Sequence, residues 1–207
     1  MNQATRSSRV FAGLPPHGAG QRIGLYGGSF NPPHEGHRQT SLKALYRLKL
    51  DAVWWLVTPG NPLKEAQGLK PLSERMRAAA ELAAHPRFFI TGIEARWRLR
   101  YTADFLTRLT ARLPATRFVW IMGSDNLQGF HRWEDWNEIA ATVPIAVVPR
   151  PQSLTALLSS RAAVALRRYR LPTIFAPLLA DCVPPAYIVL DGPRTGASST
   201  ALRIGAE

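Results

Sequence analysis

Short apolar runs alternate along this chain with longer stretches of helical periodicity, and this alternation restricts the possible folds more than any other feature. The apolar runs lie at residues 23–26, 52–57, 88–90, 118–122, 145–148 and 187–190. Helical patterns lie between them at residues 34–50, 73–84, 103–113 and 153–168, whereas the proline-rich stretch 171–185 has no clear pattern. Strands that alternate with helices in this way are typical of βαβ units on a parallel sheet. The sequence predicts a single doubly wound α/β domain that binds its ligands at the carboxyl ends of the strands.

The first 20 residues differ from the rest because they are rich in Gly, Pro, Ser and Ala and have no apolar period. We expect a flexible N-terminal extension over residues 1–20 and one domain over residues 21–207. No internal repeat or linker divides the remainder. A chain of 207 residues is long enough to bury a substantial core.

Composition narrows the environment and the partners of the protein. No stretch approaches the roughly 20 consecutive apolar residues that a membrane span needs, so no membrane association is expected. Cys182 is the single cysteine, which excludes an intrachain disulfide and favours the cytoplasm. The formal net charge of +12 indicates either anionic small substrates or nucleic acid, and the basic residues are spread along the chain instead of forming one tail.

The segment from residue 27 to residue 37 carries the strongest chemical signal. Gly27 and Gly28 close the first predicted strand, where the lack of a Cβ atom favours a sharp turn and a close approach to a ligand. A Pro-Pro pair then precedes a helix start, whose free N–H groups and dipole favour anions. His34 and His37 are three residues apart and share one face of the first helical turn. These features predict a phosphate site in which two imidazoles donate to phosphoryl oxygens.

Other interpretations of the same segment fit less well. The spacing matches neither Gly-x-x-x-x-Gly-Lys-Ser/Thr nor the dinucleotide pattern Gly-x-Gly-x-x-Gly. A zinc helix of the type His-Glu-x-x-His is not matched either, because the sequence here is His-Glu-Gly-His and no third ligand is evident. We therefore expect no metal bound by these histidines.

Residues 27–37 resemble the phosphate-binding motif of the HxGH nucleotidyltransferases, and residues 22–203 as a whole resemble the bacterial nicotinate-nucleotide adenylyltransferases. The resemblance implies a Rossmann-like nucleotidyltransferase fold. It also implies transfer of an adenylyl group from ATP, accompanied by Mg²⁺, to nicotinate mononucleotide. The products would be nicotinate adenine dinucleotide and pyrophosphate, in NAD biosynthesis. A homo-oligomer is compatible with this assignment.

The resemblance extends to motifs on the acceptor side. Lys64 ends a loop similar to the family's Asn-Pro-x-Lys, in which the basic residue faces phosphates. Tyr101 and Thr102 resemble the Ser-Tyr-Thr segment whose backbone recognises the pyridine carboxylate, although Arg100 departs from the usual small residue. Trp133 stands where the family stacks a Trp on the pyridine ring. Thr102 as a helix cap and Trp133 as a core residue remain open as alternatives.

Further motifs resemble the family's nucleotide contacts. Gly123 and Asp125 match a Gly-x-Asp loop, in which the carboxylate accepts hydrogen bonds from a ribose. The run from Ser198 to Arg203 resembles the family's Ser-x-Thr-x-x-Arg signature, a second anion site, with Ala197 in place of the usual Ile. Arg75 lies in the helix expected after Ser73, its predicted cap, and is open between a family feature and a surface residue.

These motifs together define the expected site. Catalytic roles are assigned to His34, His37, Lys64 and Arg203. Contacts to ATP are assigned to Gly27, Gly28, Ser29, Phe30, His34, His37, Gly123, Asp125, Ser198, Ser199, Thr200 and Arg203. Contacts to the acceptor are assigned to Tyr101, Thr102, Trp133 and Lys64.

Two alternative functions remain. The acceptor of the adenylyl group would be nicotinamide mononucleotide or phosphopantetheine in the first. In the second, the charge of +12 reflects a nucleic-acid-binding protein, whose binding would be salt-sensitive. The aromatic residues lie mostly in predicted strands and helices instead of alternating with Arg on an exposed face, so we expect no nucleic-acid partner.

Overall fold

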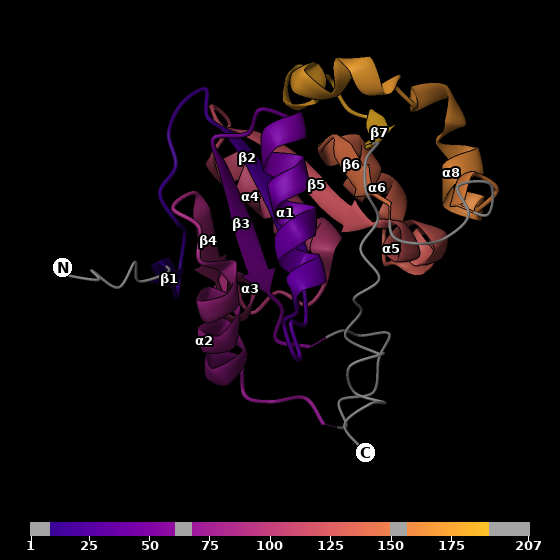
Figure 1. Ribbon diagram of the computed structural model, residues 1–207. Helices are drawn as coiled ribbons and strands as arrows, with labels where there is room; N and C mark the ends of the chain where they lie inside the picture. Colours follow the sequence, from indigo (N-terminus) through magenta and orange to yellow (C-terminus); the bar gives the residue numbers. More distant parts are fainter. Residues whose placement is uncertain (1–8, 61–67, 150–156, 191–207) are drawn as a thin grey trace.

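A computed structural model of the protein describes residues 9–60, 68–149 and 157–190. One parallel sheet of seven strands runs through it in the order β1-β4-β3-β2-β5-β6-β7 (Figure 1). The strands are β1 (Arg9–Phe11), β2 (Arg22–Gly28), β3 (Ala52–Val57), β4 (Phe88–Thr91), β5 (Arg117–Gly123), β6 (Ile145–Val148) and β7 (Tyr187–Val189). The predicted doubly wound α/β fold is confirmed.

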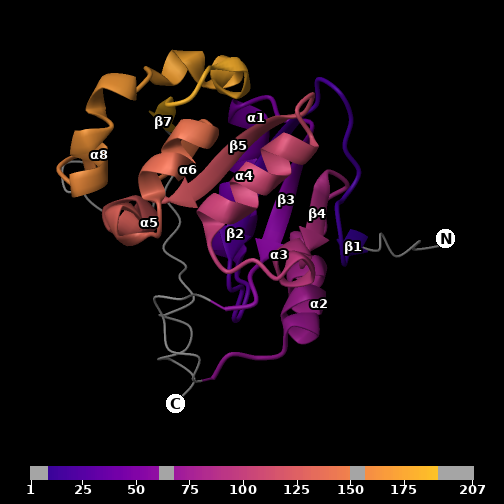
Figure 2. The same cartoon turned by 180° about the vertical axis from the view of Figure 1, so that it is seen from behind.

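Helices cover both faces of the sheet. The first face carries α1 (Glu35–Arg47), α2 (Leu72–Ala83) and the 3₁₀ helix η3 (Thr173–Asp181) (Figure 1). The opposite face carries α3 (Ile93–Trp97), α4 (Thr102–Arg112), α5 (Ser124–Gly129), η1 (Phe130–Arg132), α6 (Trp136–Thr142) and α8 (Arg161–Ala165) (Figure 2). None of the helices in the described part of the chain has the length and apolar character that crossing a membrane would require.

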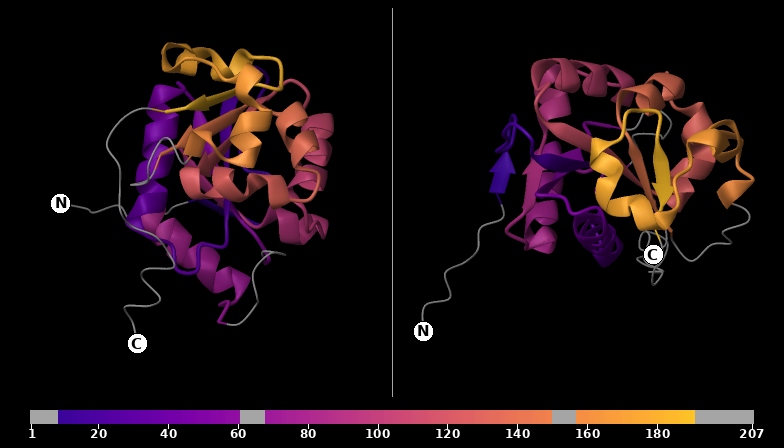
Figure 3. Two further views of the ribbon diagram at one scale, coloured as in Figure 1. Left: turned by 90° about the vertical axis from the view of Figure 1, so that its right-hand side faces the viewer. Right: turned by 90° about the horizontal axis from the view of Figure 1, so that it is seen from above.

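The strands are buried on both faces, which explains their continuous apolar sequences. Along β3, Trp54 and Leu56 join the core on the side of α4, whereas Val53 and Trp55 join the core on the side of α1. All six residues of β3 are buried. Seen from above, β1 and β7 lie at opposite edges of the sheet with the helices on either side (Figure 3).

The N-terminal segment corrects the sequence prediction. Residues 9–20 are not a flexible extension, because β1 pairs with β4 and places the edge of the sheet at Arg9. The ring of Phe11 contacts that of Phe89, and the Thr91 hydroxyl donates to the Gly13 carbonyl at 2.6 Å. A three-residue strand has too short an apolar run to be seen in the sequence. Residues 1–8 lie outside the described residues.

Most other predicted elements are confirmed within one to three residues, with two exceptions. The helix predicted over residues 153–168 is confirmed only in part, because within its described part it breaks at Ser159 and restarts as α8, capped by the Ser160 hydroxyl. The predicted cap Ser73 is wrong, since α2 begins at Leu72 after Pro71. Pro71 has no backbone N–H to lose at a helix start.

The strand order determines where a ligand fits. Strand β2 pairs with β3 on one side and with β5 on the other. Strands β3 and β4 therefore follow on one side of β2, and strands β5, β6 and β7 on the other. The carboxyl ends of β2 and β5 therefore meet at a topological switch point, the usual ligand site of an open parallel sheet. Residues 27–37 and 123–125 both lie there.

Candidate active site

Gly27 and Gly28 are the last two residues of β2 and pair with Leu56 and Val57. A Cβ atom on Gly27 would lie 2.7 Å from Cη2 of Trp120, and one on Gly28 would lie 3.3 Å from Cε2 of Phe30. These glycines therefore make room for aromatic side chains of the core. The sharp turn predicted at this pair is wrong, because both residues continue the strand.

The chain turns instead at Phe30, which has a φ of 47°. This left-handed conformation costs a side-chain-bearing residue about 1 kcal/mol. Burial of the ring offsets the cost, since Phe30 is 1% exposed and stacks on Trp55 at 4.9 Å with an interplanar angle of 8°. The ring also lies 4.8 Å from that of His37. Phe30 therefore offers a ligand its backbone and not its ring.

The two histidines are brought together at the start of α1, as the sequence predicted. His34 is the N-cap residue and His37 lies in the first turn, with their ring centroids 3.8 Å apart. The backbone N–H of His34 donates to Nδ1 of His37 at 3.1 Å. Because Nδ1 accepts this bond, the proton of the neutral His37 ring is on Nε2. Both side chains are buried, at 5% and 7% exposure.

The first turn of α1 retains its attraction for anions although it contains an acidic residue. Glu35 accepts hydrogen bonds from Arg38 at 3.2 Å and from Gln39 at 2.6 Å, so its charge is partly balanced on the exposed side of the helix. Gly36 is buried between the histidines. The N–H groups and dipole of a 13-residue helix thus converge on the carboxyl end of β2.

Arg75 is the residue that the sequence left open between a family feature and a surface position, and it is not on the surface. It is 2% exposed and donates to the carbonyl oxygen of Ser29, in the loop between β2 and α1, at 2.7 Å. The helical spacing of the sequence could have indicated this burial, because Arg75 shares a face of α2 with the buried residues Ala79 and Ala83. An arginine at such a position is easily taken for a surface residue when only the sequence is known.

Apart from Arg75, Glu94 in α3 is the one Asp, Glu, Lys or Arg side chain that is buried among the described residues. Burial raises the pKa of its carboxyl group to about 8. Glu94 is therefore largely protonated at neutral pH, which avoids the large cost of burying a lone carboxylate.

The carboxyl end of β5 lies beside that of β2, where the loop to α1 begins. Gly123 ends the strand and is the N-cap residue of α5, and Asp125 follows in the first turn of that helix with its side chain exposed. Because β5 pairs with β2, Asp125 lies at the carboxyl edge of the strand next to β2. Its contact with a ribose stays a prediction.

The described residues that were predicted to bind the acceptor lie on the face of the sheet covered by α4 and α6. Tyr101 is the N-cap residue of α4 and Thr102 begins the helix, so the alternative of Thr102 as the cap is wrong. The half-buried ring of Trp133 contacts Trp120 at 6.3 Å and Phe130 at 5.5 Å. The ring of Trp120 also occupies the space that a side chain on Gly27 would need, so packing connects Trp133 to the end of β2.

Five predicted residues lie outside the described residues. They are Lys64, Ser198, Ser199, Thr200 and Arg203.

Known proteins resemble this chain in sequence and in fold. The sequence profile of the cytidylyltransferase-like family matches residues 25–204. A "probable nicotinate-nucleotide adenylyltransferase" of Bradyrhizobium sp. (strain BTAi1) is 56% identical over 182 residues, which cover 88% of this chain and 95% of that protein. The protein of the same name from Brucella abortus (strain 2308) is 52% identical over 181 residues, or 87% and 93% of the two chains.

The fold is also similar to that of a solved structure, the Plasmodium falciparum nicotinic acid mononucleotide adenylyltransferase. Its complex with NaAD aligns with a TM-score of 0.66 and 15% identity, over 89% of this chain and 83% of that one. Its complex with APC aligns with a TM-score of 0.65 and 16% identity. At this low identity the likeness to the solved structure shows the fold alone. The bacterial relatives, in contrast, are similar in sequence over nearly their whole length. The chain therefore belongs to the cytidylyltransferase-like family and, within it, to the nicotinate-nucleotide adenylyltransferases.

Proposed function

We propose that the loop between β2 and α1, with the two histidines at the start of α1, binds the phosphates of ATP. As a nicotinate-nucleotide adenylyltransferase, the chain transfers an adenylyl group to nicotinate mononucleotide and forms nicotinate adenine dinucleotide. The observation that supports the site is the buried pair His34 and His37 at the switch point of the sheet. The net charge of +12 suits two anionic substrates.

The reaction is a direct displacement at phosphorus. A phosphate oxygen of nicotinate mononucleotide attacks the α-phosphorus of ATP in line, the bond from that phosphorus to the bridging oxygen breaks, and pyrophosphate leaves with the electron pair. No covalent bond to the protein is needed, so its contribution is positioning and stabilisation of charge. The Nε2–H group of His37 donates to a phosphoryl oxygen on which charge develops, and His34 lies beside it.

Magnesium is proposed to accompany ATP. Within residues 9–60, 68–149 and 157–190, no three His, Cys, Asp or Glu side chains gather into a group that could hold a metal ion. The phosphate oxygens of the nucleotide and water are therefore the proposed ligands. The ion would neutralise part of the charge on the leaving pyrophosphate.

The pyridine ring of the acceptor is proposed to stack on Trp133, with its carboxylate at the start of α4. The 11 residues of α4 direct free N–H groups and a partial positive charge toward the segment at Tyr101 and Thr102. This environment favours the charged acid over the neutral amide. Lys64 is proposed to bind phosphate, Asp125 a ribose, and Ser198, Ser199, Thr200 and Arg203 a second group of phosphate oxygens.

A pyrophosphate-release assay with ATP and either nicotinate or nicotinamide mononucleotide tests the proposal. We expect pyrophosphate release from ATP with nicotinate mononucleotide, and much slower release with nicotinamide mononucleotide. If neither mononucleotide supports pyrophosphate release, the acceptor assignment is refuted. We expect the reaction in the cytoplasm, because a chain with one cysteine forms no intrachain disulfide and therefore suits a reducing compartment.

A further inference from the structure

Arg75 and Asn31 connect three segments beneath the proposed phosphate site. The guanidinium of Arg75 donates from Nη1 to the carbonyl oxygens of Ser29 at 2.7 Å and Thr58 at 2.8 Å. Its Nε donates to the carbonyl oxygen of Lys70 at 2.8 Å, and its Nη2 lies 3.5 Å from that of Pro59. One side chain of α2 thus holds the β2–α1 loop, the end of β3 and the segment before α2.

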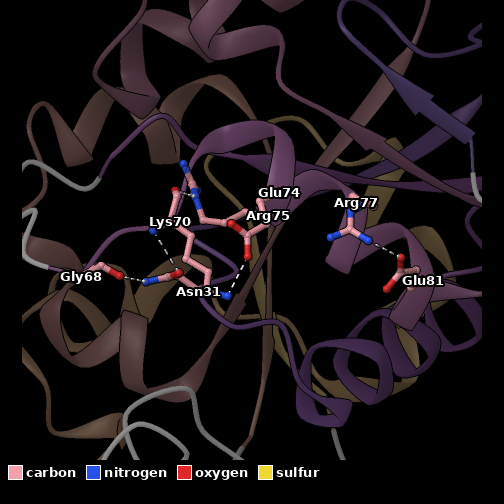
Figure 4. Close-up of polar contacts among 7 residues, drawn as sticks. All are labelled: Asn31, Gly68, Lys70, Glu74, Arg75, Arg77 and Glu81. Carbon is pink, nitrogen blue, oxygen red and sulfur yellow. Dashed lines mark hydrogen bonds and ion pairs between the residues drawn. The ribbon is translucent and has the colours of Figure 1, made fainter.

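The charge of Arg75 is unbalanced in the part of the chain that the structure describes. Its four hydrogen bonds all go to backbone carbonyls, and no ion pair includes it. The adjacent carboxylate of Glu74 pairs with the Lys70 ammonium at 2.6 Å instead (Figure 4). Burial lowers the pKa of Arg75, but a guanidinium remains protonated in proteins.

A buried, unpaired cation is costly for a fold, and an apolar side chain would fill the same space at lower cost. The cost is offset when an anion binds close by. Arg75 reaches the backbone of the loop that carries the proposed ATP site, so a bound polyphosphate would supply that anion. This places the positive charge behind the loop and leaves the histidines in front to contact the ligand.

Asn31 fastens the same loop at a second point. Its Nδ2 donates to the carbonyl oxygen of Gly68 at 2.9 Å, and its Oδ1 accepts from the backbone N–H of Lys70 at 3.3 Å (Figure 4). Asn31 is 5% exposed. The two attachment points, Ser29 and Asn31, lie on either side of Phe30 with its φ of 47°.

The attachment at Ser29 also sets the direction of one peptide group. The C=O and N–H of a trans peptide point in opposite directions. Since the Ser29 carbonyl points to Arg75, the N–H of Phe30 points away from the guanidinium. Held in this way, the loop does not need to reorganise its donors when the nucleotide binds.

We propose that Arg75 is a positioning residue for adenylyl transfer, which presets the β2–α1 loop together with Asn31 and contributes charge to its phosphate site. The proposal rests on the proposed function of that loop. It predicts that loss of Arg75 lowers kcat and weakens nucleotide binding beyond any loss of stability.

The test compares Arg75→Ala and Arg75→Lys with Arg77→Ala. Arg77 lies on the same helix, and its exposed side chain pairs with Glu81 (Figure 4). We expect kcat to fall about tenfold to a hundredfold in both Arg75 variants, and by less than about twofold in Arg77→Ala, as usual for an exposed ion pair. Lysine keeps the charge, but its compact ammonium cannot reach carbonyls on three segments.

Chemical rescue separates positioning from a merely structural role. Millimolar guanidinium chloride should restore part of the kcat and of the ATP affinity of Arg75→Ala, whereas the same concentration of sodium chloride should not. A folded Arg75→Ala with the kcat and ATP affinity of the wild type would overturn the proposal. So would an Arg75→Lys variant that regains the wild-type kcat and ATP affinity at temperatures well below its Tm, because its defect would then come from lost stability. If Arg75→Ala does not fold, Arg75→Lys decides alone.

Calorimetric titration with ATP tests the positioning role of Arg75 separately from the assignment of nicotinate mononucleotide as the acceptor. If the wild type binds ATP but does not turn over nicotinate mononucleotide, the acceptor assignment fails. Weaker ATP binding by the Arg75 variants, with rescue by guanidinium, would still support the positioning role, and unchanged binding would refute it.

Discussion

The backbone N–H of His34 donates to Nδ1 of His37 at 3.1 Å, so one histidine sets the tautomer of the other. The bond caps α1 and also leaves the proton of the neutral His37 ring on Nε2. A structural contact at a helix start thereby prepares a donor for phosphate.

Asn and Gln separate these two roles at position 37. Asn places a polar atom near the position of Nδ1, so His37→Asn should keep the cap but lose the donor, with kcat falling about 10²-fold to 10³-fold. Gln extends to the position of Nε2, so His37→Gln should keep more of the activity and lose about 1 kcal/mol of stability. Steady-state kinetics and urea unfolding measure the two effects. The opposite ranking of kcat would refute the role of Nε2.

Gly27→Ala should disturb the core and the acceptor site together. The added Cβ would lie 2.7 Å from Cη2 of Trp120, and such overpacking costs about 1–3 kcal/mol. Because Trp120 contacts Trp133, we expect a larger rise in KM for nicotinate mononucleotide than for ATP. Gly18→Ala is the matched control, since its nearest neighbour would be 3.7 Å away. Unchanged stability of Gly27→Ala would contradict the packing role of this glycine.

The two tryptophans after η1 allow a paired test of stacking. Trp133 and Trp136 contact Phe130 at nearly equal distances, 5.5 and 5.6 Å. Trp133→Ala should raise KM for nicotinate mononucleotide about tenfold, the effect of losing roughly 1.4 kcal/mol of stacking. Trp136→Ala should lower Tm and leave that KM close to the wild-type value. Equal changes in KM for the two variants would assign Trp133 to the core.

Glu94 should make the stability of the protein depend on pH. Its pKa is about 8 in the folded protein and 4.5 as the ordinary value, so between these pH values the native state holds a proton that the unfolded chain has released. Stability should therefore fall as pH rises through this window and be unaffected by Glu94 below it. Glu94→Gln removes this dependence and should raise the free energy of unfolding by about 5 kcal/mol at pH 9.

Urea unfolding of the wild type and Glu94→Gln from pH 5 to pH 9 measures this difference. The exposed Glu81→Gln serves as control and should follow the wild type. Parallel pH profiles for wild type and Glu94→Gln would show that the carboxyl group of Glu94 is not protonated in the fold.

The sheet was predictable because its central strands are buried on both faces. Their continuous apolar sequences, such as residues 52–57, coincide with the strands, and β3 matches its prediction to the residue. Strand β1 was not predictable, because three residues carry too little periodicity, and their pairing with β4 depends on an edge that only the folded sheet presents.

The site shows the same division between local and long-range information. The sequence by itself determined the reaction class, since His34, Gly36 and His37 are close in the chain and the local geometry of the helix cap brings the histidines together. Only the tertiary structure decided the place of Arg75, whose partners Ser29 and Thr58 are 46 and 17 residues away. It also decided that Gly27 accommodates Trp120. Contacts between distant residues depend on how helices pack on the finished sheet, and no short pattern in the chain records that packing.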